Sequence, residues 1–135
     1  MKKLISITLT IMMLSLSGCT NHNPQSATLK LTANASTGYE WKTNLDNKGI
    51  IEIKTAYHDS KHKNLAGAPG TFQIDIKAVK TGKVILTLDY LREWEKDNIY
   101  QLTYEISVNQ DLKLKIGKAS GNYTEITLPE FKISE

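Results

Sequence analysis

Apolar residues recur at every second position over most of this chain, and this period constrains its fold more than any other feature. Leu29, Leu31 and Ala33 alternate with polar residues, and the same pattern returns over residues 72–78 and 100–108. Successive side chains of a β-strand point to opposite faces, so strict alternation predicts half-buried antiparallel strands. Many short strands separated by turns favour an all-β sandwich or barrel. Six strands are expected near residues 28–33, 39–43, 50–57, 71–79, 83–91 and 99–108.

The N-terminal segment is typical of an exported, lipid-modified protein. Two lysines precede an apolar stretch over residues 4–16, which is too short to span a membrane as a helix. The stretch ends in Leu-Ser-Gly-Cys, which resembles a bacterial lipobox, in which Cys19 is acylated and residues 1–18 are removed. The alternative is an ordinary signal peptide followed by a free thiol. We expect an extracytoplasmic lipoprotein anchored in the lipid bilayer through Cys19, with residues 19–27 as a flexible tether.

The charge balance and the cysteine count exclude several classes of protein. The chain has 17 Lys and Arg against 14 Asp and Glu, so its formal charge is +3, and removal of Lys2 and Lys3 leaves 15 against 14, or +1. No basic run is present, so we expect no binding to nucleic acid. Cys19 is the single cysteine, so no disulfide is available and the core alone must stabilise the fold. One domain of about 115 residues is large enough for that.

Three polar loops are expected to meet at one end of the molecule. If successive strands are antiparallel, the chain reverses at each connection, so the first, third and fifth connections share one end. These connections contain residues 34–39, 67–70 and 91–95. The second and fourth connections, at residues 44–49 and 80–83, are predicted to be ordinary polar turns at the other end.

In their order and spacing, the three loop segments resemble those of the chagasin family of cysteine protease inhibitors. Residues 34–39 read Asn-Ala-Ser-Thr-Gly-Tyr, where the family carries an Asn-Pro-Thr-Thr-Gly-Tyr-like loop. Residues 67–70 read Gly-Ala-Pro-Gly and match a Gly-rich loop, while residues 92–94 read Arg-Glu-Trp and match an Arg-Pro-Trp-like loop. The resemblance covers roughly residues 28–108. It implies an immunoglobulin-like antiparallel β-sandwich over residues 28–110, of about seven to eight strands when the C-terminal strands are counted.

The resemblance implies an inhibitor of papain-like cysteine proteases rather than an enzyme. The three loops would form a wedge that fills the active-site cleft of the protease without covalent chemistry, so no cofactor is expected. Carried over to this chain, Thr37 would face the catalytic cysteine of the protease, and Trp94 would be the aromatic anchor with Arg92 beside it. The residues expected to bind the protease are Asn34, Ser36, Thr37, Gly38, Tyr39, Gly67, Ala68, Pro69, Gly70, Arg92 and Trp94.

Individual residues of the loops suit these expected roles, and two depart from the family pattern. Gly38 permits a positive φ, and Asn34 can cap the first turn through its amide. The two glycines of residues 67–70 would let the middle loop lie flat on the cleft wall. Ala35 and Glu93 stand where the family has proline, which frees the backbone and is expected to weaken binding.

The C-terminal segment, residues 111–135, is expected to add two more strands. Alternation over residues 112–116 and a second strand over residues 123–133 flank a polar turn region. Residues 114–117, Leu-Lys-Ile-Gly, and 126–129, Ile-Thr-Leu-Pro, resemble the opening strand of the family, for which this chain has no counterpart near its N-terminus. The segment is therefore interpreted either as an edge strand in a permuted arrangement or as an unrelated β-hairpin extension.

Aromatic and charged residues near the loops have structural interpretations as well. Strand alternation places Trp41 in the core, whereas Trp94 stands among charged residues and is expected to be exposed. Arg92 and Glu95 can form a surface salt bridge of little energy.

Two other functions are alternatives to the inhibitor, and a metal site was considered as well. One is a non-inhibitory immunoglobulin-like envelope lipoprotein for adhesion, and the other is a carbohydrate-binding module that uses Trp94 and Tyr39 as stacking platforms. His58 and His62 lie in a polar loop without an evident third ligand, so no metal site is expected. A wedge needs no second copy of itself, so we expect a monomer.

Overall fold

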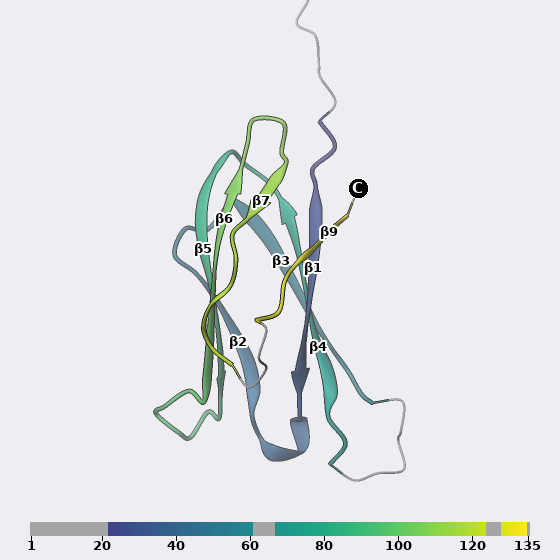
Figure 1. The fold of residues 1–135 in the computed structure, drawn as a ribbon, viewed down its shortest axis with the longest axis vertical. Helices are drawn as coiled ribbons and strands as arrows, with labels where there is room; N and C mark the ends of the chain where they lie inside the picture. Colours follow the sequence, from purple (N-terminus) through teal and green to yellow (C-terminus); the bar gives the residue numbers. More distant parts are fainter. Residues whose placement is uncertain (1–21, 61–66, 124–127, 135) are drawn as a thin grey trace, which may run out of the picture.

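The computed structural model describes residues 22–60, 67–123 and 128–134, which form two antiparallel β-sheets packed on each other (Figure 1). The first sheet has the order β3-β4-β1-β9 and the second has the order β2-β5-β6-β7, with β8 also paired to β6. The predicted all-β antiparallel sandwich is confirmed, and β1 to β6 begin and end within two residues of the expected bounds. The elements are β1 (Ser26–Ala33), η1 (Ala35–Thr37, a 3-10 helix), β2 (Glu40–Leu45), β3 (Ile51–His58), β4 (Gly70–Ala78), β5 (Gly82–Leu91), β6 (Tyr100–Val108), β7 (Leu114–Ile116), β8 (Ser120–Asn122) and β9 (Lys132–Ser134).

The core lies between the two sheets and consists of the inward-facing set of the alternating residues. Leu29 of β1, Leu88 of β5 and Leu102 of β6 are each 0% exposed. Trp41 is 4% exposed, which confirms its predicted place in the core. Its indole Nε1 donates a hydrogen bond to the Thr32 carbonyl oxygen at 3.1 Å, so its one polar atom is satisfied although the ring is buried.

The first strand begins earlier than expected, and this corrects the extent of the tether. Ser26 is the first residue of β1, and Ala27 is fully buried. The backbone N–H of Gln25 donates to the Leu112 carbonyl at 3.0 Å, and its own carbonyl accepts from the Ala78 N–H at 2.9 Å. The prediction of a flexible tether up to residue 27 is therefore wrong over its last three residues. These residues pair with distant strands, which their mostly polar local sequence does not indicate.

The C-terminal segment is attached to both sheets. β7 pairs with the end of β6, and β9 pairs with the beginning of β1, so the segment crosses from one sheet to the other (Figure 1). It supplies edge strands to both sheets, which favours the first of the two interpretations, although β8 lies where a turn was expected. The long strand predicted over residues 123–133 is wrong: in its described part only Lys132 and Ile133 are in a strand, and residues 124–127 lie outside the described residues.

Aromatic packing holds this segment against the core. The rings of Tyr104 and Phe131 meet edge to face, with centroids 5.1 Å apart. The Tyr104 hydroxyl donates to the Pro129 carbonyl oxygen at 2.7 Å. Tyr104 is 0% exposed, and burial raises its pKa well above the usual value for tyrosine. Tyr104 therefore links the core of the sandwich to the C-terminal segment.

Replacement of Tyr104 by phenylalanine is expected to lower the free energy of unfolding by about 1 kcal/mol at neutral pH, because the bond to Pro129 is lost. The unfolded chain ionises this phenol near pH 10, whereas the folded chain keeps it neutral, so the wild type loses stability as the pH rises above about 10. The phenylalanine variant lacks this loss, so the difference in free energy of unfolding between the two proteins should be smaller at about pH 11 than at neutral pH. Urea unfolding of both proteins at neutral pH and at about pH 11 measures this difference. If the two free energies of unfolding changed in parallel with pH, the role assigned to the Tyr104 hydroxyl would be wrong.

Candidate functional site

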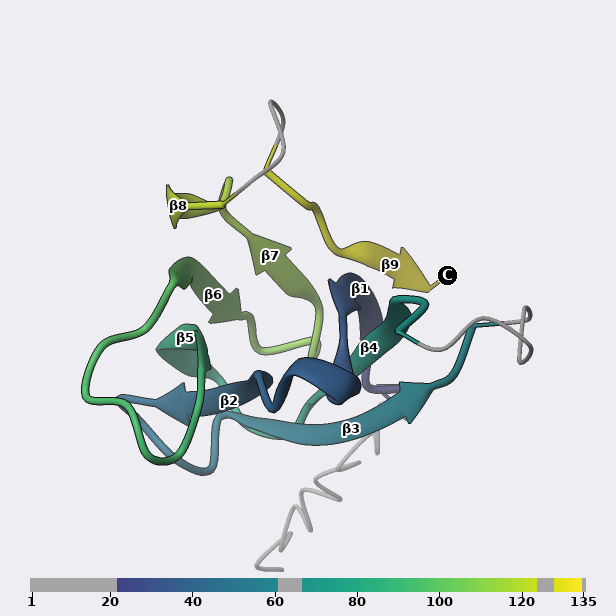
Figure 2. The ribbon, with the colours of Figure 1, turned by 90° about the horizontal axis from the view of Figure 1, so that it is seen from below.

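The three predicted loops lie at one end of the sandwich, as the parity of the strands requires. Figure 2 looks onto this end and shows the β1–β2 connection between the β5–β6 connection and the start of β4. The amide Nδ2 of Asn34 in the first connection donates to the Gly67 carbonyl in the second of these loops at 3.0 Å. The guanidinium Nε of Arg92 in the last loop donates to the Thr37 carbonyl at 2.9 Å. The first loop is thus bonded to both of its neighbours.

The first loop is held by its own side chains. Asn34 caps η1, because its Oδ1 accepts from the Ser36 backbone N–H at 3.2 Å and from the Ser36 hydroxyl at 2.6 Å. The Thr37 hydroxyl donates back to the Asn34 carbonyl at 2.7 Å. Gly38 follows with φ +77°, a left-handed conformation that favours glycine. The expected cap and the expected positive φ are both present, and they order a loop that lacks the proline of the family pattern.

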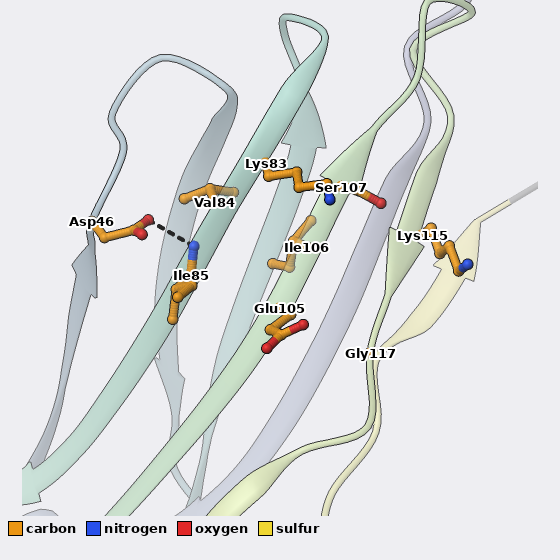
Figure 3. Close-up of a pocket in the computed structure, with 9 residues that line it drawn as sticks. All are labelled: Asp46, Lys83, Val84, Ile85, Glu105, Ile106, Ser107, Lys115 and Gly117. Atoms are coloured by element: carbon orange, nitrogen blue, oxygen red, sulfur yellow. Dashed lines mark hydrogen bonds between the residues drawn. The ribbon is translucent and has the colours of Figure 1, made fainter.

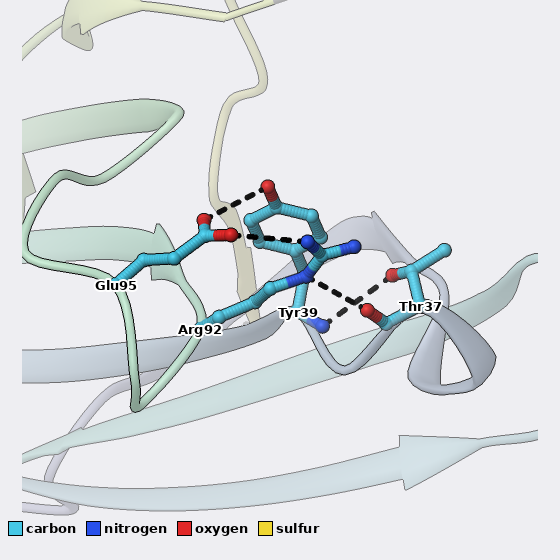
Figure 4. A network of polar contacts seen from close by, with 4 residues as sticks. All are labelled: Thr37, Tyr39, Arg92 and Glu95. Carbon is cyan, nitrogen blue, oxygen red and sulfur yellow. Dashed lines mark hydrogen bonds and ion pairs between the residues drawn. The ribbon is translucent and has the colours of Figure 1, made fainter.

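Arg92 directs its polar groups to residues of this chain (Figure 4). Its Cζ lies 4.1 Å from the centroid of the Tyr39 ring, a cation–π arrangement. Its Nη1 pairs with Glu95 Oε1 at 3.0 Å, and the Tyr39 hydroxyl donates to Glu95 Oε2 at 3.1 Å. Exposure limits what the ion pair alone contributes, as predicted. The Tyr39 backbone N–H donates to the Thr37 hydroxyl at 3.4 Å, and with the Arg92 bond to the Thr37 carbonyl this closes a ring of four residues. Loss of solvation, reinforced by the Glu95 carboxylate, raises the pKa of Tyr39.

Trp94 is 72% exposed, which confirms its predicted exposure. Its ring lies over Gly38: a Cβ added at Gly38 would come within 2.6 Å of Trp94 Cη2. The Arg92 Cζ lies 5.8 Å from the same ring. Gly38 therefore has a second role, as the flat surface on which the Trp94 ring rests.

The middle loop divides into an exposed part and a buried part. Gly67 has φ +84° and is exposed, as is Pro69, while Ala68 is half-buried. Gly70 is buried as the first residue of β4, where it pairs with Ala33. The prediction that Gly70 lies in the flat binding loop is corrected: a Cβ there would collide with the Tyr57 hydroxyl and the His58 carbonyl, so this glycine permits close packing of β3 and β4.

The model of the family described as chagasin family peptidase inhibitor I42 matches residues 21–108. This chain belongs to the chagasin family. Amoebiasin-2 of Entamoeba histolytica is 31% identical over 86 residues, covering 59% of this chain and 68% of Amoebiasin-2. The crystal structure of the cysteine protease inhibitor EhICP2 from Entamoeba histolytica matches with a TM-score of 0.54 and 27% identity, over 61% of this chain and 77% of that chain.

Membership in the chagasin family confirms the immunoglobulin-like sandwich and the role of a cysteine protease inhibitor that is not an enzyme. In the described residues, no group of three or more His, Cys, Asp and Glu side chains is arranged to hold a metal ion. His62 lies outside the described residues. No helix in the described part of the chain is long and apolar enough to cross a membrane.

The structure gives two residues a part in this chagasin-family site that the sequence did not indicate. The hydroxyl of Tyr90, the last inward-facing residue of β5, accepts a hydrogen bond from the Asn34 N–H at 3.1 Å. Its ring stacks on that of Tyr39, with centroids 5.4 Å apart. Glu95 joins Arg92 to Tyr39. Tyr90 could have been found as an aromatic residue at the end of a strand that leads into a loop. Glu95 was predicted only as a salt-bridge partner of Arg92, and its bond to Tyr39 has no signal in the sequence.

The same geometry disfavours Tyr39 as a carbohydrate platform. Tyr39 stacks on Tyr90 and also carries the Arg92 guanidinium against its ring. A sugar ring would therefore have to displace Arg92 to stack on Tyr39. Among the two aromatic residues proposed for that function, only Trp94 is largely exposed.

Proposed function

We propose that this chain is a membrane-anchored inhibitor that blocks the active-site cleft of papain-like cysteine proteases without covalent chemistry. The inhibiting part is a wedge, defined here as residues 34–39, 67–69 and 92–95. The observation that carries the proposal is the hydrogen bonding of the central loop to both outer loops, through Asn34 to Gly67 and through Arg92 to Thr37. A lipoprotein that used the fold only for adhesion would not need the three loops to form one continuous edge.

Pre-organisation explains how the wedge can bind without two of the family's prolines. A loop that is ordered before binding loses less conformational entropy when it meets its partner. In this chain the Asn34 cap fixes the segment around Ala35, and the Arg92 Nε bond to Thr37 fixes the last loop against the first. We therefore assign Arg92 to positioning within the wedge rather than to pairing with an acid of the protease.

The exposed atoms of the wedge suit insertion into a cleft. Ser36, Thr37 and Pro69 are exposed in the first and middle loops, and Trp94, whose ring lies over Gly38, is largely exposed as well. The Thr37 hydroxyl already donates to the Asn34 carbonyl, so it is not an activated nucleophile. Nanomolar binding needs about 12 kcal/mol in total, which requires several anchors and a large, well-fitted contact.

Acylation of Cys19 would place the inhibitor outside the cytoplasm, on the face of a membrane. The support is the sequence of residues 1–19, which precede the described residues. Lipid chains contribute about 0.8 kcal/mol per buried methylene group, so more than one chain gives stable anchoring.

Titration of papain with residues 20–135 tests the proposed mechanism. This segment contains every core residue, since the buried set runs from Ala27 to Leu114. We expect reversible inhibition that competes with a small peptide substrate, and recovery of uncleaved inhibitor by mass spectrometry after dissociation. Inhibition that persists at saturating substrate would contradict occlusion of the cleft. A mass increase on either protein would contradict a non-covalent mechanism.

A further inference from the structure

Three connections between strands form one surface at the end of the sandwich opposite the wedge. We call this surface the anchor end and define it as residues 46–50, 79–83 and 109–113. It is drawn at the top of Figure 1. The backbone N–H groups of Val79 and Lys80 donate to the Ile50 carbonyl at 3.0 and 3.1 Å. The Thr81 hydroxyl donates to the Asn109 carbonyl at 3.2 Å. These bonds join all three connections, so the anchor end is one surface rather than three independent turns.

Gln25 fixes the point at which the N-terminal segment leaves this surface. Its backbone bonds join it to Leu112 and Ala78, and its side-chain Oε1 accepts from the Leu114 N–H at 2.9 Å. Only residues 20–24 separate it from Cys19. At about 3.5 Å per residue, this distance spans at most about 20 Å. An acylated Cys19 would hold the anchor end that close to the bilayer, whereas β1 carries the chain away from it toward the wedge.

The anchor end carries positive charge that the described residues leave unpaired. It has four exposed lysines against two aspartates, Asp46 and Asp111. Asp46 accepts a hydrogen bond from the Ile85 N–H at 2.7 Å (Figure 3), and Asp111 lies 3.4 Å from His22. The salt bridges of the described part involve none of these lysines, which are Lys48, Lys80, Lys83 and Lys113.

The loops of the wedge end carry no such excess of positive charge. By sequence their four acids equal their four bases, which are Asp59, Glu93, Glu95 and Asp97 against Lys61, Lys63, Arg92 and Lys96. The anchor end also presents an apolar side chain among its lysines, since Val79 is 51% exposed. The groove beside it, of about 410 Å³, is lined by both Lys83 and Glu105 and does not favour an ion of either sign (Figure 3).

We propose that the anchor end is a membrane-facing surface whose lysines lie on anionic lipid headgroups, so that the wedge points away from the bilayer. Lysines close to an anionic membrane are attracted to it, and the attraction weakens within a Debye length of about 10 Å. Stable peripheral binding commonly combines a lipid chain with a basic surface. The orientation rests on the proposed acylation of Cys19, whereas the lipid-binding surface can be tested without acylation or protease.

The test is sedimentation of residues 20–135 with vesicles of phosphatidylcholine alone or with one third phosphatidylglycerol. We expect binding to the anionic vesicles that decreases as salt is raised. The variant K80E/K113E should bind about tenfold or more weakly, since each lysine near the surface contributes several-fold. The control K54E/K96E makes the same change in net charge at exposed lysines outside the anchor end. It should lose much less binding.

Two outcomes would overturn the proposal. Equal losses of vesicle binding in the two variants would mean that only net charge matters. If the wild type did not bind anionic vesicles at low salt, the anchor end would not be a lipid-binding surface. With the acylated protein in vesicles, lipids that carry a headgroup quencher should leave the Trp94 contribution to fluorescence, obtained by difference from Trp94→Ala, unchanged. Quenching of that contribution would place the wedge on the bilayer and contradict the orientation.

Discussion

Replacement of Trp94 by alanine is expected to raise the inhibition constant for papain by about 30-fold or more, the equivalent of about 2 kcal/mol or more of binding free energy. Trp94 is 72% exposed in the free chain, so the protease would remove from water a ring that the sandwich does not bury. The free energy of unfolding should change by less than about 0.5 kcal/mol for the same reason. Titration of papain with both proteins, beside urea unfolding, measures the two effects.

The matched control for this prediction is Val79→Ala. Val79 is also an exposed apolar residue, 51% accessible, but it lies at the anchor end. Its replacement should leave the inhibition constant unchanged. If Trp94→Ala inhibited papain as well as the wild type does, the aromatic anchor assigned to the third loop would be wrong.

Replacement of Gly38 by alanine is expected to impair both stability and inhibition. Gly38 has φ +77°, a conformation that costs a residue with a Cβ about 1–2 kcal/mol. The new methyl group would also lie 2.6 Å from Trp94 Cη2, so the indole ring must move off the first loop. We expect the inhibition constant for papain to rise about tenfold or more, because Trp94 would then be placed only on binding.

Replacement of Gly49 by alanine is a control that separates the effect of a positive φ on stability from the effect on inhibition. It has φ +96°, but a Cβ added there meets no atom within 4 Å, and it lies at the anchor end. Gly49→Ala should therefore cost a similar stability and leave inhibition intact. In the Trp94→Ala background, Gly38→Ala should have only a small further effect on inhibition, since the ring it displaces is gone. Additive losses of affinity in the double variant would show that Gly38 acts independently of Trp94.

Most of the sandwich could be predicted from the sequence, because the period of two is a local property of each strand. The alternation of Leu29, Leu31 and Ala33 places them on one face whatever the rest of the chain does. The parity of the connections then places the loops at one end without any knowledge of contacts. The strand ends were less well predicted where polar residues pair with distant partners, as Gln25 does with Ala78 and Leu112.

The sequence grouped the loop residues of the candidate site but did not determine their contacts. The loop motifs identified Asn34, Gly38 and Trp94, and the local geometry of the first loop follows from Asn and Gly as residue types. The role expected for Gly70 was wrong, because its burial depends on Tyr57 and His58 of a neighbouring strand.

The sequence by itself determined the strand pattern, the grouping of the loops and the family to which this chain belongs. Only the tertiary structure decided that Arg92 stacks on Tyr39 and bonds to Thr37, and that the Trp94 ring rests on Gly38. The physical reason is the distance along the sequence over which each property is determined. Backbone periodicity and turn conformation depend on neighbouring residues, whereas the partner of a side chain depends on which distant strands the packed core brings together.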